Sequence, residues 1–188
     1  RWAGDAQPIM VQSRLPLVYA FVEDVDGRMW AATQDGIWRQ SADGSFVRTD
    51  ARGPDGRRFI VMSATRDDAG RLWFGGYETG LWRHDGRGWS HYTSDDGLPS
   101  DTAYGLVDDG HGRLWISHGR GLYTLGLGDD DAPLRARIRE YGRADGLRGA
   151  AFNGGSGTPA LRTRDGLLWF SSDDGAVRID PARMPVLP

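Results

Sequence analysis

The chain has 188 residues and a formal net charge of −3 at pH 7, so it can form one compact domain with a core but has no broad positive field for holding nucleic acid. It contains no cysteine, which excludes disulfides, thiolate metal sites and cysteine nucleophiles. Gly occurs 28 times and Trp 8 times, and many tight turns combined with many large aromatic residues favour short β-strands over helices or disorder.

One motif recurs four times along the chain: an x-Gly turn, an apolar segment that carries a tryptophan, and a second glycine. The four tryptophans are Trp30, Trp73, Trp115 and Trp169, which are 43, 42 and 54 residues apart. A period of roughly 40–50 residues is typical of a four-stranded β-propeller blade. The sequence therefore predicts an all-β fold, a β-propeller of which this chain contains four four-stranded antiparallel blades.

Each blade is expected to consist of four strands, which we call A, B, C and D in chain order. Strand A precedes the x-Gly turn, strand B carries the tryptophan, strand C follows the second glycine, and strand D is polar and aromatic. The expected A strands cover 17–23, 59–65 and 102–107, the B strands 29–32, 72–74, 114–117 and 168–170, and the D strands 45–48, 88–92 and 135–141. Strand B is apolar at successive positions, as in Leu114-Trp115-Ile116, which indicates that neighbouring blades cover both of its faces.

The repeat places the four blades at about 15–50, 57–93, 102–142 and 158–183. Residues 1–14 are expected to supply the outer strand of a neighbouring blade, or of the last blade, which lacks a strand D of its own. The wider third spacing is assigned to loop insertions at 126–133 and 148–157. The favoured interpretation is the C-terminal part of a larger propeller, and the alternative is that four blades close alone. The chain starts at Arg1 and shows no signal peptide, so we expect a processed form or a piece of a longer protein.

The repeat unit resembles that of the two-component regulator propeller family over nearly the whole chain, from about Leu15 to Arg183. The resemblance is carried by Asp109-Gly-His-Gly-Arg-Leu-Trp-Ile-Ser117 and by the linker Asp95-Asp-Gly-Leu-Pro99. Val177-Arg-Ile-Asp-Pro181 is similar to the end of the family's terminal blade. The resemblance implies a non-catalytic ligand-sensing propeller in the periplasmic part of an inner-membrane receptor. It also implies a histidine kinase or diguanylate cyclase output beyond this chain, phosphorelay signalling, and a homodimer through the propeller faces.

The varied turns of the repeat are the expected recognition surface. In a propeller the B–C turns and D–A connections lie on one face, and here the B–C turns differ in sequence while the A–B turns are nearly uniform. Varied polar and aromatic loops suit recognition of a small polar ligand such as a carbohydrate. The expected ligand-binding residues are Gln34, Asp35, Tyr77, Glu78, Asp101, Tyr104, His118, Arg120, Asn153 and Asp173.

No catalytic residue, metal site or cofactor is expected. The four histidines form no metal-binding pattern, the Asp-Gly turns lack the glutamate of a calcium loop, and Thr158 stands where a nucleophile elbow needs glycine. No apolar stretch approaches the roughly 20 residues that span a bilayer, so we expect no membrane insertion by this segment. Two other hypotheses stay open: a carbohydrate-active enzyme using Asp35, Glu78 or Asp173 as acids, and a pure protein-interaction scaffold.

Overall fold

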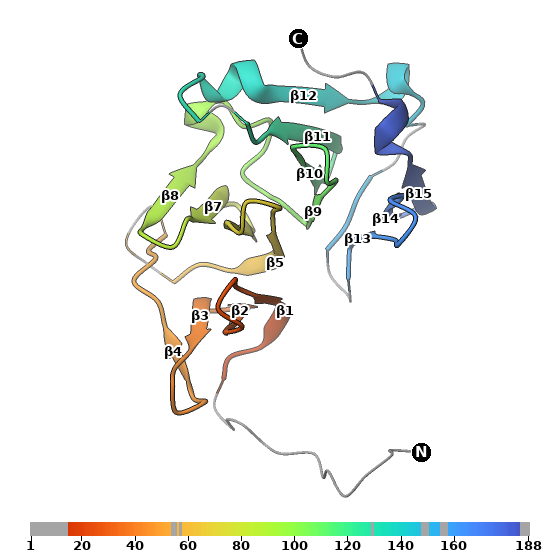
Figure 1. Cartoon of the computed structure of the whole chain (residues 1–188). Helices are drawn as coiled ribbons and strands as arrows, with labels where there is room; N and C mark the ends of the chain where they lie inside the picture. Colours follow the sequence, from red (N-terminus) through yellow and green to blue (C-terminus); the bar gives the residue numbers. More distant parts are fainter. Residues whose placement is uncertain are drawn as a thin grey trace, which may run out of the picture.

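A computed structural model describes residues 15–53, 56, 58–128, 130–147, 151–154 and 158–184. Its strands form four antiparallel sheets in which spatial order follows chain order (Figure 1). Blade 1 consists of β1 (Val18–Glu23), β2 (Met29–Thr33), β3 (Gly36–Gln40) and β4 (Phe46–Arg48), and blade 2 of β5 (Val61–Arg66), β6 (Leu72–Gly76), β7 (Leu81–His84) and β8 (Trp89–Tyr92). Blade 3 consists of β9 (Gly105–Asp108), β10 (Arg113–His118), β11 (Gly121–Gly126) and β12 (Ile138–Tyr141), and blade 4 of β13 (Ala160–Arg162), β14 (Leu168–Ser172) and β15 (Gly175–Ile179).

The blades are arranged around a common centre, as a propeller requires. Figure 1 shows the four sheets following one another in an arc, and the innermost strands β1, β5, β9 and β13 contact one another in that order. The predicted all-β propeller with four antiparallel blades is therefore confirmed. Blade 4 has three strands among the described residues, in line with its missing strand D.

Two predicted strands are shorter than expected. β12 begins at Ile138 because the preceding residues form the 3-10 helix η2 (Leu134–Arg137), in which Arg137 is buried and donates to Asp130 at 2.9 Å. β9 begins at Gly105, since the preceding residues complete the connection from blade 2. The other 3-10 helices are η1 (Ser94–Asp96), η3 (Arg143–Asp145) and η4 (Pro181–Arg183). The predicted strand at 1–14 and much of the predicted 148–157 insertion lie outside the described residues.

An aspartate at the start of each A–B turn holds the motif tryptophan of blades 1 to 3. The indole Nε1 of Trp73 donates to Asp67 Oδ2 at 2.8 Å, and that of Trp115 to Asp109 Oδ2 at 2.9 Å. Trp30 has the same bond to Asp24 at 2.8 Å. A buried indole N–H needs an acceptor, and a carboxylate that also binds the turn is a strong one.

The motif arginines extend these turns into the next blade. Arg71 donates from Nε to Asp67 at 2.7 Å and from an Nη to the Leu127 carbonyl of blade 3 at 3.1 Å. Arg113 likewise binds Asp109 at 2.6 Å and the Pro181 carbonyl after blade 4 at 2.6 Å. In blades 2 and 3 the motif arginine therefore links its own turn to the neighbouring blade with charge-assisted bonds, whereas Arg28 of blade 1 lies 3.9 Å from Asp26 of its own turn.

One packing rule describes the three junctions between blades. The motif tryptophan lies on the face of its blade that looks toward the following blade, which we call the trailing face. In the following blade it packs against a pair of cross-strand residues. These residues lie on the face that looks back toward the tryptophan, which we call the leading face. The pairs are Phe74 and Trp82 for Trp30, Ile116 and Tyr123 for Trp73, and Phe170 and Val177 for Trp115. These contacts make the core.

The arc of four blades is open. Trp30, Trp73 and Trp115 are 3%, 1% and 0% exposed, whereas Trp169 of blade 4 is 38% exposed. Phe21, on the leading face of blade 1, is 54% exposed. Strands of blades 1 and 4 make no comparable contact within the described part of the chain. The four blades therefore do not close on one another. None of the helices that the structure describes is long and apolar enough to cross a membrane.

Candidate functional site

The predicted site residues belong to the edge that carries the B–C turns and D–A connections, which we call the B–C rim. In blade 1, Asp35 has a structural role. Its carbonyl accepts from Arg48 Nε at 3.1 Å, and its carboxylate lies 3.6 Å from the Arg48 guanidinium and 3.4 Å from that of Arg58. The adjacent Gln34 is exposed and lies in the same turn. Blade 1 therefore uses its predicted acid to hold the turn rather than to face a ligand.

The turn of blade 2 presents a strained backbone to solvent. Glu78 has φ +57, the one positive value at a non-glycine position in the described ranges, and its N–H donates to Thr102 Oγ1 at 3.0 Å. Tyr77 beside it is 40% exposed, as a stacking ring would need to be. Asp101, in contrast, accepts from the N–H and the hydroxyl of Ser94 at 2.6 and 2.7 Å, so its carboxylate is already engaged.

Predicted residues from blades 3 and 4 come together on the B–C rim. Asn153 donates from Nδ2 to the carboxylate of Asp173, whose own N–H donates to the Ala151 carbonyl at 2.9 Å. Tyr104 lies against Gly154, where an added Cβ would meet the ring at 2.8 Å. This stretch therefore needs glycine so that the connection can cross the tyrosine. Two of the predicted residues, Tyr104 and Asp173, thus fix the position of the connection between blades 3 and 4.

His118 is at the base of the same region and is buried. Its ring packs edge-on against Tyr123 with centroids 5.7 Å apart. Burial, with a smaller effect of Arg120, lowers the pKa of His118 to about 4. The imidazole is therefore neutral at pH 7, which suits a supporting role beneath the rim rather than direct contact with an anion.

A hollow of about 260 Å³ lies beside these residues on the B–C rim. Arg120 and Arg143 line it together with Leu147 and Ala151. The remaining lining residues are glycines, at positions 119, 121 and 142. Sequence reasoning identified Arg120 but missed Arg143, because Arg143 belongs to the connection after strand D and not to a B–C turn. The signal that could have found it is the Gly142-Arg143 pair just before the Asp-Gly-Leu linker.

A second cavity, of about 310 Å³, occupies the centre of the arc. All four innermost strands or the connections next to them contribute to it, among them Tyr19 and Phe21 of blade 1, Ser63 of blade 2, Leu106 of blade 3 and Thr158 before β13. Tyr19, Ser63 and Thr158 supply hydroxyls in an otherwise apolar lining. An apolar lining that contains a few polar groups is the usual composition of a small-ligand pocket.

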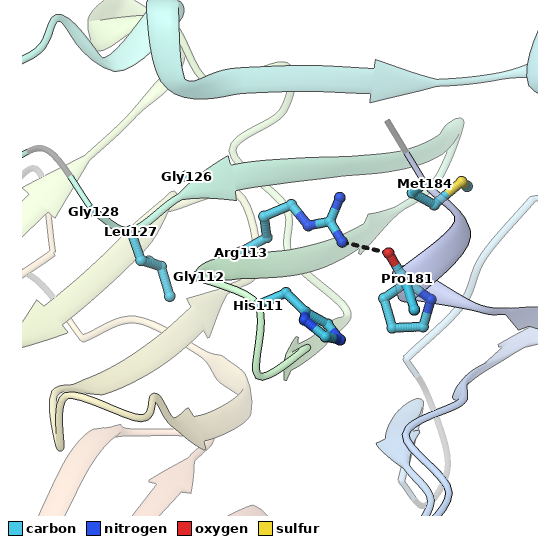
Figure 2. A pocket seen from close by; sticks show the side chains of 9 residues that line it. His111, Gly112, Arg113, Gly126, Leu127, Gly128, Pro181 and Met184 are labelled. Carbon is cyan, nitrogen blue, oxygen red and sulfur yellow. Dashed lines mark hydrogen bonds between the residues drawn. The ribbon is translucent and has the colours of Figure 1, made fainter. Parts of the chain in front are cut away.

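Another hollow, of about 490 Å³, lies on the opposite edge, where the A–B turns emerge, which we call the A–B rim. Figure 2 shows its lining: His111 and Arg113 from the A–B turn of blade 3, Leu127 after β11, and Pro181 and Met184 near the C-terminal end. The Arg113 guanidinium reaches toward Pro181 but is bound to that carbonyl and to Asp109. Uniform A–B turn sequences gave no hint of this hollow, because Pro181 and Met184 come from another blade.

Asp108 is a buried carboxylic acid near the A–B rim. Loss of hydration on burial raises its pKa to about 6, opposed by the Gly110 N–H that it accepts and reinforced by the nearby Asp68, Asp109 and Asp67. The Arg162 guanidinium, 3.9 Å away, is too distant to offset this. Because the folded-state pKa exceeds the unfolded one, protonation of Asp108 favours folding at low pH. That contribution is lost as the pH rises through about 6.

We expect Asp108→Asn to stabilise the protein at pH 7.5, because the amide keeps the acceptor for Gly110 without the buried charge. The gain in the free energy of unfolding should be about 2 kcal/mol at pH 7.5 and under about 1 kcal/mol near pH 4. Urea unfolding at both pH values measures it, with Asp26→Asn in an exposed turn as the matched control. A gain of equal size at both pH values would contradict the assignment.

The fold and the two rims together define the class of protein: an open β-propeller arc with a hollow on each rim, of which the one on the B–C rim is lined by two arginines. No protein-family model matches the chain, and no curated protein sequence matches it.

Solved structures do match. The extracellular domain of the hybrid two component system BT3049 from B. thetaiotaomicron superimposes with a TM-score of 0.71 and 19% identity, over 94% of this chain and 23% of that one. That of BT4673 from the same organism gives a TM-score of 0.67 and 22% identity, over 88% of this chain and 23% of that one. A catalytically inactive virginiamycin B lyase from Staphylococcus aureus gives 0.62 and 21%, over 88% and 53%.

These likenesses show the fold. The chain has the propeller fold found in extracellular domains of two-component receptors, so the resemblance seen in its repeat is confirmed at that level. The chain spans about a quarter of the length of those receptor domains and about half of the lyase. What the whole receptors sense or transmit is not carried over by the fold.

Proposed function

We propose that this chain is part of a non-catalytic, ligand-sensing propeller in the extracytoplasmic region of a bacterial signalling receptor. Its ligand is a small polar molecule such as a carbohydrate, bound at the B–C rim between blades 3 and 4. The observation that supports this most directly is the hollow lined by Arg120 and Arg143 beside the Asn153–Asp173 pair. Convergent donors and acceptors on a rigid scaffold suit recognition of hydroxyl and carboxylate groups.

The geometry supports binding better than catalysis. A general acid or base must reach its substrate. Of the three acids that the enzyme hypothesis names, Asp35 is held by arginines and the Asp173 carboxylate accepts from Asn153, whereas Glu78 is exposed. On the same rim His118 is 5% exposed, and His91 is stacked on Trp82 with its Nε2 2.6 Å from the Thr79 carbonyl. The carbohydrate-active enzyme and the scaffold remain the rival functions.

The wider receptor assignments belong to the same proposal. On the resemblance of the repeat we also propose a periplasmic location, a homodimer through the propeller faces, and an output through a kinase or cyclase domain with a phosphorelay. Ligand binding transmits a signal only if two arrangements of the receptor bind the ligand with different affinity.

Calorimetric titration with neutral and acidic mono- and disaccharides tests the proposal. Removing one charge-assisted bond from a site weakens binding about tenfold, so we expect this increase in Kd for Arg120→Ala and for Asn153→Ala. Arg164→Ala, on the opposite rim, is the matched control and should leave Kd unchanged. Absence of binding by a correctly folded protein, or equal effects of all three variants, would refute a B–C rim site.

A further inference from the structure

The motif arginine of blade 1 departs from the pattern that its equivalents in blades 2 and 3 follow. Arg71 and Arg113 each join the aspartate of their own turn to a main-chain carbonyl that comes after the third strand of the next blade. The Arg28 side chain is instead 56% exposed, and within the described part of the chain its ion pair is with Asp26, at 3.9 Å. At the junction of blades 1 and 2, Arg28 therefore does not fill the position that a guanidinium fills at the other two junctions.

A hollow of about 180 Å³ lies at this position on the A–B rim. Asp24 and Trp30 of blade 1 line one side of it, and His84 and Asp85 of blade 2 line the other. Asp24 Oδ2 accepts from the Trp30 indole at 2.8 Å, and the same oxygen of the equivalent Asp67 accepts from both an indole and a guanidinium. Asp24 therefore presents to the hollow the acceptor that its equivalent gives to an arginine.

Aromatic rings form one wall of the hollow. The centroid of the His84 ring lies 4.9 Å from that of Trp30 and 4.8 Å from that of Trp89, and the Arg39 guanidinium lies over the Trp30 ring at 5.6 Å. His84 stands at the cross-strand position that Gly126 has in blade 3, so this junction has a ring that the next one lacks. Burial is the largest effect on the pKa of His84 and lowers it, so the imidazole is neutral at pH 7 and does not repel a cation.

The charged groups around the hollow leave it one positive charge short of neutrality. Its lining contains three carboxylates and two guanidinium groups, those of Asp24, Asp26, Asp85, Arg28 and Arg39. Burial acts to raise the pKa of Asp24, but the hydrogen bonds from the Trp30 indole and from the turn together outweigh it and lower that pKa. The N–H groups of Arg87 and Gly88 lower the pKa of Asp85. Both carboxylates are therefore charged at pH 7, and one added cation balances the lining.

We propose that this hollow between blades 1 and 2 binds a small guanidinium-bearing ligand, held by Asp24 and Asp85 beside the rings of Trp30 and His84. A guanidinium is planar, donates two parallel hydrogen bonds to a carboxylate and stacks on aromatic rings, whereas an ammonium acts as a point charge. The volume of about 180 Å³ suits a guanidinium on a short alkyl stem, since it is smaller than a drug-sized pocket. The hollow is on the A–B rim, so it is separate from the ligand site proposed on the B–C rim and does not depend on it.

NMR titration of the nitrogen-15-labelled chain with N-ethylguanidinium chloride tests the proposal, with n-butylammonium chloride as the control cation. The indole N–H signal of Trp30, assigned with Trp30→Phe, should shift and saturate. The signals of Trp73 and Trp115 should not move, because an arginine already binds their aspartates. The Kd for the ammonium should be about fivefold higher or more, because an ammonium cannot form the paired hydrogen bonds.

Three substitutions of Asp by Asn locate the site. Asp85→Asn should weaken binding about tenfold, because it removes a charge while the amide oxygen still accepts from the N–H groups of Arg87 and Gly88. Asp24→Asn should weaken binding at least as much. Asp95→Asn makes the same change of charge at an exposed position of η1, on the opposite rim, and as the matched control it should leave Kd unchanged.

Three results would overturn the inference. The first is a Trp30 signal that does not saturate at tens of millimolar ligand. The second is equal weakening by Asp85→Asn and Asp95→Asn, which would mean general attraction of cations. The third concerns Arg28→Ala, which should change Kd by less than about threefold. If Arg28→Ala alone moves the Trp30 signal and tightens binding about tenfold or more, Arg28 itself occupies the hollow. The saccharide titrations test the B–C rim independently of all three results.

Discussion

Asp109→Ala is expected to lower the free energy of unfolding by about 4 kcal/mol and the Tm by about 10 °C. The Asp109 side chain is fully buried and accepts from the Trp115 indole, the Arg113 guanidinium and the N–H groups of His111 and Arg113. Removing it leaves a buried cation and several buried donors without an acceptor, and each unsatisfied group costs free energy. Urea unfolding monitored by tryptophan fluorescence measures the change.

The repeat supplies its own controls for this substitution. Asp24 makes the equivalent indole and turn bonds in blade 1 but is only half-buried, so Asp24→Ala should cost clearly less. Asp26, in the same turn, is exposed, and Asp26→Ala should be close to neutral. Similar losses for Asp109→Ala and Asp26→Ala would mean that the motif aspartate contributes only turn propensity.

Gly80→Ala is expected to cost about 3–5 kcal/mol, combining backbone strain with a collision. Gly80 has φ +80, and a Cβ there would lie 2.1 Å from the Tyr92 carbonyl oxygen of the neighbouring strand. Its N–H also donates to the Asp101 carbonyl at 2.7 Å, so the backbone is held on both sides. Thermal and urea unfolding of the variant measure the loss.

Gly86→Ala separates the two causes. Gly86 has φ +87, nearly the same as Gly80, but an added Cβ would have no atom within 4 Å. It should therefore show the strain of a left-handed residue alone, about 1 kcal/mol. If the two alanine variants were equally unstable, close approach of the strands would not be what requires glycine at position 80.

The sequence predicted the blades well because the spacing of the repeated motif equals the length of one blade. The motif tryptophans, the x-Gly turns and the apolar B strands recur at blade spacing, and each element is confirmed with its ends shifted by at most a few residues. The exceptions are informative. β12 starts late because Arg137 turns inward to Asp130, a contact between residues of one loop that no periodic pattern encodes.

The candidate site was less predictable, since a rim is assembled from loops of different blades. The turn-by-turn reasoning found Arg120, Asn153 and Asp173, which the fold gathers, but also Asp35 and Asp101, which are engaged in holding loops. It missed Arg143, which lies outside the B–C turns, and it could not foresee the hollow at Pro181 and Met184, because the other residues that line this hollow are remote in sequence. Whether the side chain of a loop residue points to solvent or is engaged within the protein is decided by packing between blades.

The bridges made by Arg71 and Arg113 have a consequence for how the arc opens. Each guanidinium joins a carboxylate of its own blade to a main-chain carbonyl of the next, so two blades cannot separate without exposing a charge pair. In a linear stack whose units touch only their neighbours, loosening then spreads inward from the ends. Amide hydrogens of β10 should consequently exchange most slowly and those of the end blades 1 and 4 sooner, and a ligand that tightens blade 4 should slow exchange in blade 3 as well.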